Sequence, residues 1–165
     1  MKNFVSVGIG EIVVSKNPQE VLVSYGLGSC VALCLYDPLF KIGGMAHIML
    51  PDSRVSGEKN HNFGKFADTA VPYLIEKMRE KGAIKFSLRA KIFGGSRMMF
   101  NNSNISDWLD IGSKNVIAVK SALKREGINL EEENVGGNLA RTVLFFIEDG
   151  NVIVKNGLLK KINRR

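Results

Sequence analysis

The stretch SYGLGSCVALCLYDPLFKIGGMAHIML, residues 24–50, carries the pattern on which the fold and the candidate chemistry depend. Val31–Tyr36 within it is a short apolar run, typical of a buried strand. Asp37–Phe40, with the sequence DPLF, indicates a turn, because proline presets the backbone at the second turn position and aspartate favours the first. Segments 30–36 and 41–50 therefore form a predicted hairpin.

The predicted register of this hairpin brings a thiol and an imidazole together. With the turn centred between Pro38 and Leu39, Cys30 faces His47, and about 4.5–5.5 Å separates their Cβ atoms. A one-residue bulge would send the two side chains to opposite faces. Because a nearby imidazolium lowers a thiol pKa, Cys30 is the candidate nucleophile and His47 the candidate base.

Glycines lead into the candidate nucleophile. Gly26 and Gly28 allow backbone conformations closed to other residues and permit close approach of a substrate. The loop Gly28–Ser29 precedes Cys30, and the backbone amides around Ser29 and Cys30 are candidates for holding an oxyanion.

The second cysteine, Cys34, faces Gly43 in the same register and therefore has no base opposite it. Cys30 and Cys34 share a strand face but lie roughly 13 Å apart along an extended chain. That spacing predicts neither a disulfide nor a shared metal ion. A cysteine in an apolar run is usually a small core residue, and this is the interpretation we favour for Cys34.

The rest of the chain alternates apolar segments with two stretches of helical periodicity. A helix is predicted over 68–81, with Asp68 as its cap, Pro72 in its first turn and Gly82 at its end. A second helix is predicted over 113–126. Strands are predicted over 4–9, 20–25, 85–93, 141–147 and 152–154. Many strands with two main helices predict one α+β domain, its helices packed on mixed sheets.

Composition indicates a globular cytoplasmic protein. The 165 residues suit one domain, 45% are hydrophobic, and no apolar run approaches the roughly 18 residues of a membrane span. Polar residues interrupt the N-terminus, which does not resemble a secretion signal, so both cysteines are expected to stay reduced. The net charge of +7 is concentrated in the tail 160–165, and no basic stripe interleaved with aromatics predicts a nucleic-acid partner.

Six short motifs occur in order along nearly the whole chain and omit only the tail. They are Gly26-Leu27-Gly28-Ser29-Cys30-Val31-Ala32, Gly44-Met45-Ala46-His47-x-Met49-Leu50-Pro51-Asp52-Ser53, Lys65-Phe66-Ala67-Asp68-Thr69-Ala70, Phe93-Gly94-Gly95-Ser96, Ile111-Gly112-x-x-Asn115 and Gly136-Gly137-Asn138-x-Ala140-Arg141. Each motif is modest alone. The ordered set resembles the CheD family of chemotaxis proteins.

This resemblance implies a layered α/β sandwich over 1–159 and an activity that the residues alone do not name. Proteins of the CheD family hydrolyse the side-chain amide of particular glutamines on methyl-accepting chemotaxis receptors, giving glutamate and ammonia. Family members also commonly bind the CheC phosphatase and stimulate it. By position, Cys30 matches the family nucleophile and His47 its histidine, while Ser24 stands where a threonine that orients the histidine is expected.

The expected reaction uses a cysteine thioester and needs no cofactor. The Cys30 thiolate attacks the amide carbon, amides around Ser29 and Cys30 hold the oxyanion, and protonated His47 releases ammonia. Water then hydrolyses the thioester with His47 as the base.

Two other interpretations remain open at this point. One is a zinc site made by Cys30, Cys34, His47 and His61, although a Cys-x3-Cys spacing on a strand chelates poorly. The other is a non-enzymatic binding module that regulates a chemotaxis phosphatase. Metal analysis distinguishes the first from the deamidase, and ammonia release from receptor fragments distinguishes the second.

Overall fold

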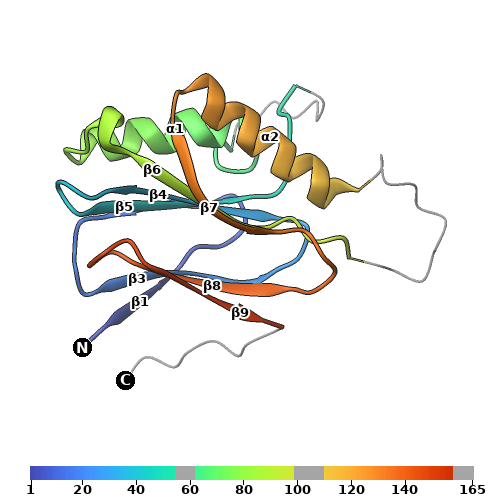
Figure 1. Cartoon of the computed structure of the whole chain (residues 1–165), viewed down its shortest axis with the longest axis horizontal. Coiled ribbons are helices and arrows are strands. Elements are labelled where there is room, and N and C mark those ends of the chain that lie inside the picture. The colour runs from blue at the N-terminus through green and yellow to red at the C-terminus, as the bar shows by residue number, and fades with distance from the viewer. Residues whose placement is uncertain (55–61, 99–109, 158–165) are drawn as a thin grey trace.

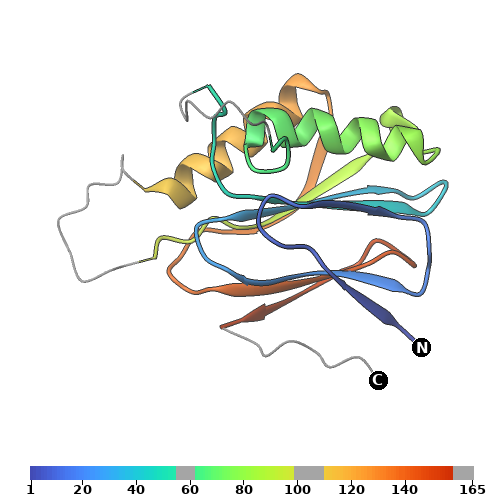
Figure 2. The ribbon, with the colours of Figure 1, turned by 180° about the vertical axis from the view of Figure 1, so that it is seen from behind.

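The structure is a computed structural model that describes residues 1–54, 62–98 and 110–157. Two sheets and two helices form three layers, with both helices covering the outer face of one sheet and the second sheet packed on its inner face (Figure 1). The reverse view shows the same layers (Figure 2). The predicted α+β class, with mixed sheets and two main helices, is confirmed.

Both sheets mix parallel and antiparallel pairs. The sheet under the helices has the order β2 (Ile12–Ser15), β5 (Ile42–Ile48), β4 (Val31–Asp37), β6 (Arg89–Gly94) and β7 (Asn129–Val135). The second sheet has the order β1 (Asn3–Ser6), β3 (Glu20–Leu27), β8 (Arg141–Phe146) and β9 (Val152–Asn156). The β6–β7 and β1–β3 pairs are parallel, and the other neighbours run antiparallel.

Strand β4 lies at the centre of the fold and is buried on both faces. Val31, Leu33 and Leu35 belong to the core beneath the helices. Ala32 and Cys34 belong to a second core between the two sheets. This two-sided burial explains why the sequence shows a continuous apolar run here instead of an alternating pattern.

The two helices, α1 (Ala67–Glu80) and α2 (Ile111–Arg125), are confirmed with shifted starts. The prediction that Asp68 caps α1 is wrong, because the helix starts earlier and the carboxylate instead accepts hydrogen bonds from the amide and hydroxyl of Ser53. The same shift puts Pro72 inside α1 rather than in its first turn. Gly82, at φ +106°, follows the helix as predicted.

Two strands were not predicted from the sequence, and both lie at the edges of the five-stranded sheet. β7 has the sequence NLEEENV and is mostly exposed, so it shows no apolar alternation. β2 has only four residues. The strand predicted over 85–93 is partly wrong, since Lys85–Ser87 forms a short 3₁₀ helix, η1, and β6 begins at Arg89.

The β4–β5 hairpin exists, but its predicted register is wrong. His47 pairs with Ala32, not with Cys30. The ladder closes at Asp37 and Ile42, so the turn is a four-residue loop instead of the two-residue turn assumed from sequence. A slip of two residues keeps His47 on its predicted face of the sheet, while Cys30 lies just before Val31, the first paired residue of β4.

The described residues contain no helix that is both long and apolar enough to cross a bilayer. The predicted basic tail, 160–165, lies outside the described residues.

Asp37 holds the hairpin turn from inside the protein. Its fully buried carboxylate accepts hydrogen bonds from the amides of Leu39 at 2.8 Å and Phe40 at 3.3 Å. The other oxygen accepts from the amide of Ile84 at 2.9 Å. One side chain therefore joins the β4–β5 turn to the segment that follows α1.

Replacing this carboxylate should destabilise the fold. We expect Asp37→Ala to lower the free energy of unfolding by about 3 kcal/mol, because three backbone amides lose the acceptor that the buried carboxylate supplies. Chemical denaturation measures the change. The matched control is Asp149→Ala in the exposed β8–β9 turn, which should lose less than about 1 kcal/mol. Equal losses in the two variants would contradict the assignment.

Candidate active site

The chain leaves one sheet and enters the other through Gly28, Ser29 and Cys30, between β3 and β4. Since these residues belong to no ladder, their backbone carbonyls need other partners. All three carbonyls are bound by groups from the segment after β6 and from α2: Gly28 by the Ser96 amide at 2.8 Å, Ser29 by the Asn115 side chain at 2.9 Å, and Cys30 by the Gly95 amide at 2.8 Å.

Close backbone contact on this side depends on glycine at position 94. Gly94 adopts φ +106°, and a Cβ atom there would lie 2.3 Å from the carbonyl oxygen of Cys30. Any other residue would push β6 away from the crossing segment. The close approach of the β6 backbone to the crossing segment therefore explains the glycine that follows Phe93 in the Phe93–Ser96 motif.

The bound carbonyls determine where the amides of the crossing segment point. In a trans peptide the C=O group and the following N–H group lie on opposite sides, and the described chain has no cis peptide. The amides of Ser29 and Cys30 therefore point away from β6 and α2. Among the described residues, no hydrogen bond from either amide is recorded.

A cavity of about 500 Å³ lies against this crossing segment. The predicted residues Cys30, His47, Gly28 and Ser29 all line it, so the structure brings these site residues together. The remaining wall comes from the β1–β2 connection, the end of β3 and the segment after β6: Ser6, Val7, Gly8, Ile9, Tyr25, Gly26 and Met98.

The main chain of the β1–β2 connection orients His47. The Nδ1 atom lies 3.0 Å from the carbonyl oxygen of Val7, and the His47 backbone bonds to Gly10 and Glu11. Because a carbonyl only accepts, Nδ1 must carry the proton and donate. The Nε2 lone pair is then available for a proton from another group.

Ser24 does not contact the cavity, and its side chain is fully buried. Its hydroxyl lies 3.1 Å from the carbonyl oxygen of Val7 and 3.1 Å from the sulfur of Met45. Ser24 and His47 thus share the Val7 carbonyl as acceptor. The predicted influence of Ser24 on the histidine would pass through this carbonyl, without a direct bond.

A bulge at the end of β3 precedes the crossing. The β3–β8 register shifts between Ser24 and Leu27, where Gly26 adopts φ +59°. The Gly26 amide donates to the hydroxyl of Thr142 at 3.2 Å. A bulge bends its strand, and this one lies where the chain must turn towards the other sheet.

Burial shifts the pKa of each member of the candidate pair towards its uncharged form. Burial raises the pKa of the Cys30 thiol. Burial lowers the pKa of His47, with the hydrogen bond to Val7 and the charge of Glu11 acting in the opposite direction. The sequence suggested a thiolate beside an imidazolium. In the structure, burial instead favours the neutral form of each group, and both groups line the same cavity.

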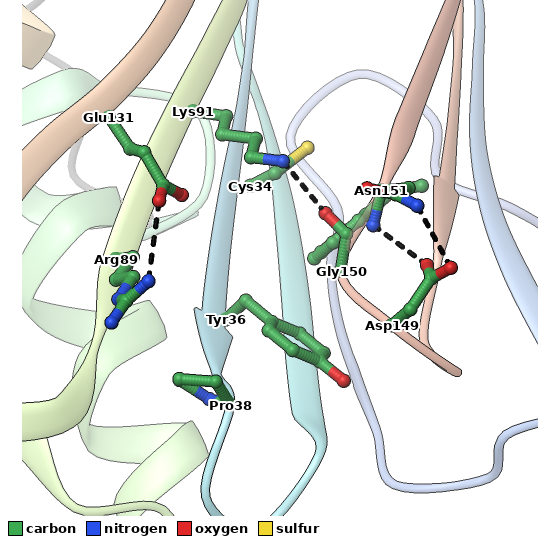
Figure 3. Close-up of a pocket in the computed structure, with 10 residues that line it drawn as sticks. Cys34, Tyr36, Pro38, Arg89, Lys91, Glu131, Asp149, Gly150 and Asn151 are labelled. Atoms are coloured by element: carbon green, nitrogen blue, oxygen red, sulfur yellow. Dashed lines mark hydrogen bonds and ion pairs between the residues drawn. The ribbon is translucent and has the colours of Figure 1, made fainter.

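Cys34 lies in a different part of the fold. It is opposite Met45, not Gly43 as predicted, and it is buried between the sheets. It touches a smaller cavity of about 190 Å³ towards the other end of β4, where Lys91 donates to the Gly150 carbonyl at 3.0 Å (Figure 3). None of the described residues that line this second cavity is a histidine. Burial raises the pKa of the Cys34 thiol strongly.

The proposed zinc ligands are only partly described. His61 lies outside the described residues, and Cys34 and Cys30 touch different cavities. Within residues 1–54, 62–98 and 110–157, no group of three or more histidine, cysteine or acidic side chains is arranged to hold a metal ion.

Sequence reasoning missed three contributors to the site. Val7 acts through its carbonyl, which no side-chain pattern can reveal. Met98 belongs to no motif singled out in the sequence, but it is 41% exposed and lines the cavity opposite Gly28. Asn115 was only part of a motif, and its contacts are far away in sequence.

The layered α+β architecture has a counterpart among solved structures. The crystal structure of a Neisseria meningitidis protein of the family DUF152 aligns with a TM-score of 0.53, covering 90% of this chain and 71% of that one. The two sequences are 12% identical, so the similarity concerns the fold alone.

Sequence comparisons identify the family. Residues 49–156 match the family described as CheD chemotactic sensory transduction. The chemoreceptor glutamine deamidase CheD of Thermotoga maritima is 49% identical, over 90% of this chain and 89% of that protein. A probable chemoreceptor glutamine deamidase CheD of Clostridium novyi is 46% identical over 93% of each chain. The chain belongs to the CheD family.

Labelling with iodoacetamide should separate the two cysteines. We expect Cys30 to be alkylated much faster than Cys34 in the folded protein, because only Cys30 lines an open cavity beside a histidine. The rate at Cys30 should rise clearly less than tenfold per pH unit between pH 7 and 8, because the lowered pKa of His47 keeps the imidazole neutral and able to accept the thiol proton there. Peptide mass spectrometry measures both sites.

The variant His47→Ala is the control for this labelling. It should slow alkylation of Cys30 near neutral pH, because no base accepts the thiol proton, and leave Cys34 unchanged. Equal labelling of both cysteines, or a Cys30 rate indifferent to His47, would contradict the pairing.

Proposed function

We propose that this protein is a chemoreceptor glutamine deamidase, which hydrolyses glutamine side-chain amides on methyl-accepting chemotaxis receptors to glutamate and ammonia. The observation that carries the proposal is the convergence on one cavity of Cys30, His47 and the amides of Ser29 and Cys30, which donate to no group among the described residues. The names of the relatives, which are chemoreceptor glutamine deamidases, support the choice of substrate.

In the first step, Nε2 of His47 takes the thiol proton as the Cys30 sulfur attacks the amide carbon of the glutamine. The carbonyl oxygen of the substrate becomes an oxyanion. It is positioned for the amides of Ser29 and Cys30, which face away from β6 and α2. The charge that develops on His47 is stabilised by the Val7 carbonyl at Nδ1.

The second step breaks the carbon–nitrogen bond. The His47 imidazolium gives its proton to the leaving nitrogen, ammonia departs, and a thioester joins Cys30 to the substrate. Neutral His47 then removes a proton from water, which attacks the thioester and regenerates the thiol with glutamate as product. Each group in this sequence belongs to the chain itself, so the proposal requires no cofactor.

The cavity entrance suits a side chain carried on another protein. Ile9 is 59% exposed and Met98 41% exposed, and both line the cavity together with Tyr25. This apolar wall would cover the methylene groups of a glutamine while its amide reaches Cys30. Because the targets are receptor cytoplasmic domains, the proposal places the protein in the cytoplasm. It also includes binding and stimulation of the CheC phosphatase, which is supported by the family resemblance alone.

Incubation with receptor cytoplasmic fragments tests the activity. We expect a mass increase of about one unit at particular glutamines, with one ammonia released for each, as amide hydrolysis requires. Cys30→Ala should reduce this conversion at least about 1000-fold while the protein stays folded, because the nucleophile is lost. The matched control Cys34→Ala removes the other thiol and should keep near-normal turnover. Deamidation by folded Cys30→Ala would refute the mechanism.

Substitution of Ser24 tests whether its hydroxyl influences His47 through the Val7 carbonyl. We expect Ser24→Ala to lower turnover about tenfold, as when the partner that supports a functional histidine is removed. Ser24→Thr retains the hydroxyl and should restore most of the activity. Steady-state kinetics on receptor fragments measure both variants. Wild-type turnover in Ser24→Ala would show that the Val7 carbonyl orients the His47 ring without the Ser24 hydroxyl.

A further inference from the structure

We propose that Asn115 is a positioning residue that ties the chain segment carrying Cys30 to the segment carrying His47, and that it aims the Cys30 amide into the cavity. This inference rests on the proposed function, because it assigns a role within the same site. Asn115 lies in the first half of α2, is fully buried and does not line the cavity.

The side chain makes two hydrogen bonds with one nitrogen. Its Nδ2 donates to the carbonyl of Ser29 at 2.9 Å and to the carbonyl of Met49 at 2.9 Å. Since both partners are carbonyls, which only accept, the group facing them must be the NH₂ end of the amide. The orientation of the side chain is therefore determined by its surroundings.

The two acceptor carbonyls belong to the two chain segments that carry Cys30 and His47. Ser29 directly precedes Cys30, and Met49 lies two residues after His47, just beyond the end of β5. The β4–β5 ladder pairs Val31 with Ile48 and extends no further in this direction. Asn115 thus joins the two segments where the ladder between them stops.

The hydrogen bond to Ser29 also has a directional effect. The Ser29 carbonyl and the Cys30 amide belong to the same planar peptide, so holding the carbonyl towards α2 turns the amide the opposite way. That amide is one of the two oxyanion donors in the proposed reaction. A rotation of this peptide would misdirect the donor without displacing the thiol.

Asn115 retains a feature that stability alone does not favour. Its Oδ1 atom is buried and has no hydrogen-bond partner among the described residues. An unpaired buried acceptor destabilises a fold. The residue is therefore better explained by what its two donors hold in place than by a gain in the packing of α2.

The decisive measurement is a comparison of kcat with KM in Asn115→Leu, which is similar in size but donates no hydrogen bond. We expect kcat on receptor fragments to fall about 10- to 100-fold, since small misplacements of reacting groups reduce rates by this much. KM should stay within about twofold, because Asn115 does not line the cavity. Alkylation of Cys30 by iodoacetamide should also slow, because His47 is no longer held beside the thiol.

Val119→Ala is the matched control. Val119 lies one turn further along α2, is equally buried and belongs to the core beneath the helices. Its truncation should lower the thermal midpoint while leaving kcat and the alkylation rate near wild type. Wild-type kcat in folded Asn115→Leu would overturn the proposal, as would an equal fall of kcat in Val119→Ala.

The experiments distinguish a failure of this inference from a failure of the deamidase proposal. If wild-type protein releases no ammonia from receptor fragments, the proposed function fails, and the alkylation rates still test the link between Cys30 and His47. If Asn115→Leu does not fold, Asn115→Ser supplies the kinetic test with a smaller side chain. If neither folds, scalar couplings across the hydrogen bonds from Asn115 to Ser29 and Met49, measured by NMR on wild-type protein, support the proposal when present and overturn it when absent.

Discussion

The passage of the chain from one sheet to the other is the constraint on which this structure depends. Between β3 and β4 no neighbouring strand can satisfy the backbone, so the carbonyls of Gly28, Ser29 and Cys30 are bound from one side by the segment after β6 and by Asn115. Those bonds leave the amides of the segment facing the opposite side. The geometry of the candidate site is thus a consequence of satisfying the backbone where two ladders end.

The two cores follow from the same crossing. Because β4 enters the middle of its sheet, helices cover one of its faces and the second sheet covers the other, and the strand must be apolar throughout. The inter-sheet core buries Cys34 beside a small cavity, whereas a larger cavity lies against Cys30. Two cysteines four residues apart, one just before β4 and one within it, therefore have different environments, since Cys34 is buried and Cys30 is only half-buried.

Hydrophobic pattern predicted the parts of the fold that are buried in a regular way, including β4 and both helices. It missed β7, whose mostly exposed NLEEENV sequence pairs with β6 without showing an apolar alternation. Turn chemistry located the β4–β5 turn but not its length, because Asp37 holds a four-residue loop through a contact with distant Ile84. Cys30 and His47 were found because nearby segments carry them. The partners of Asn115 could not be found, since 86 and 66 residues separate it from Ser29 and Met49.

The carbonyl of Val7 has a consequence for how this site responds to genetic change. Every amino acid supplies the same main-chain oxygen, so missense changes at position 7 that respect its burial leave the support of His47 intact. An insertion or deletion in the β1–β2 connection would instead move the oxygen itself. The orientation of His47 is thus insensitive to point substitutions at position 7 but sensitive to the length of the β1–β2 connection. Inspection of side chains alone would not reveal this dependence.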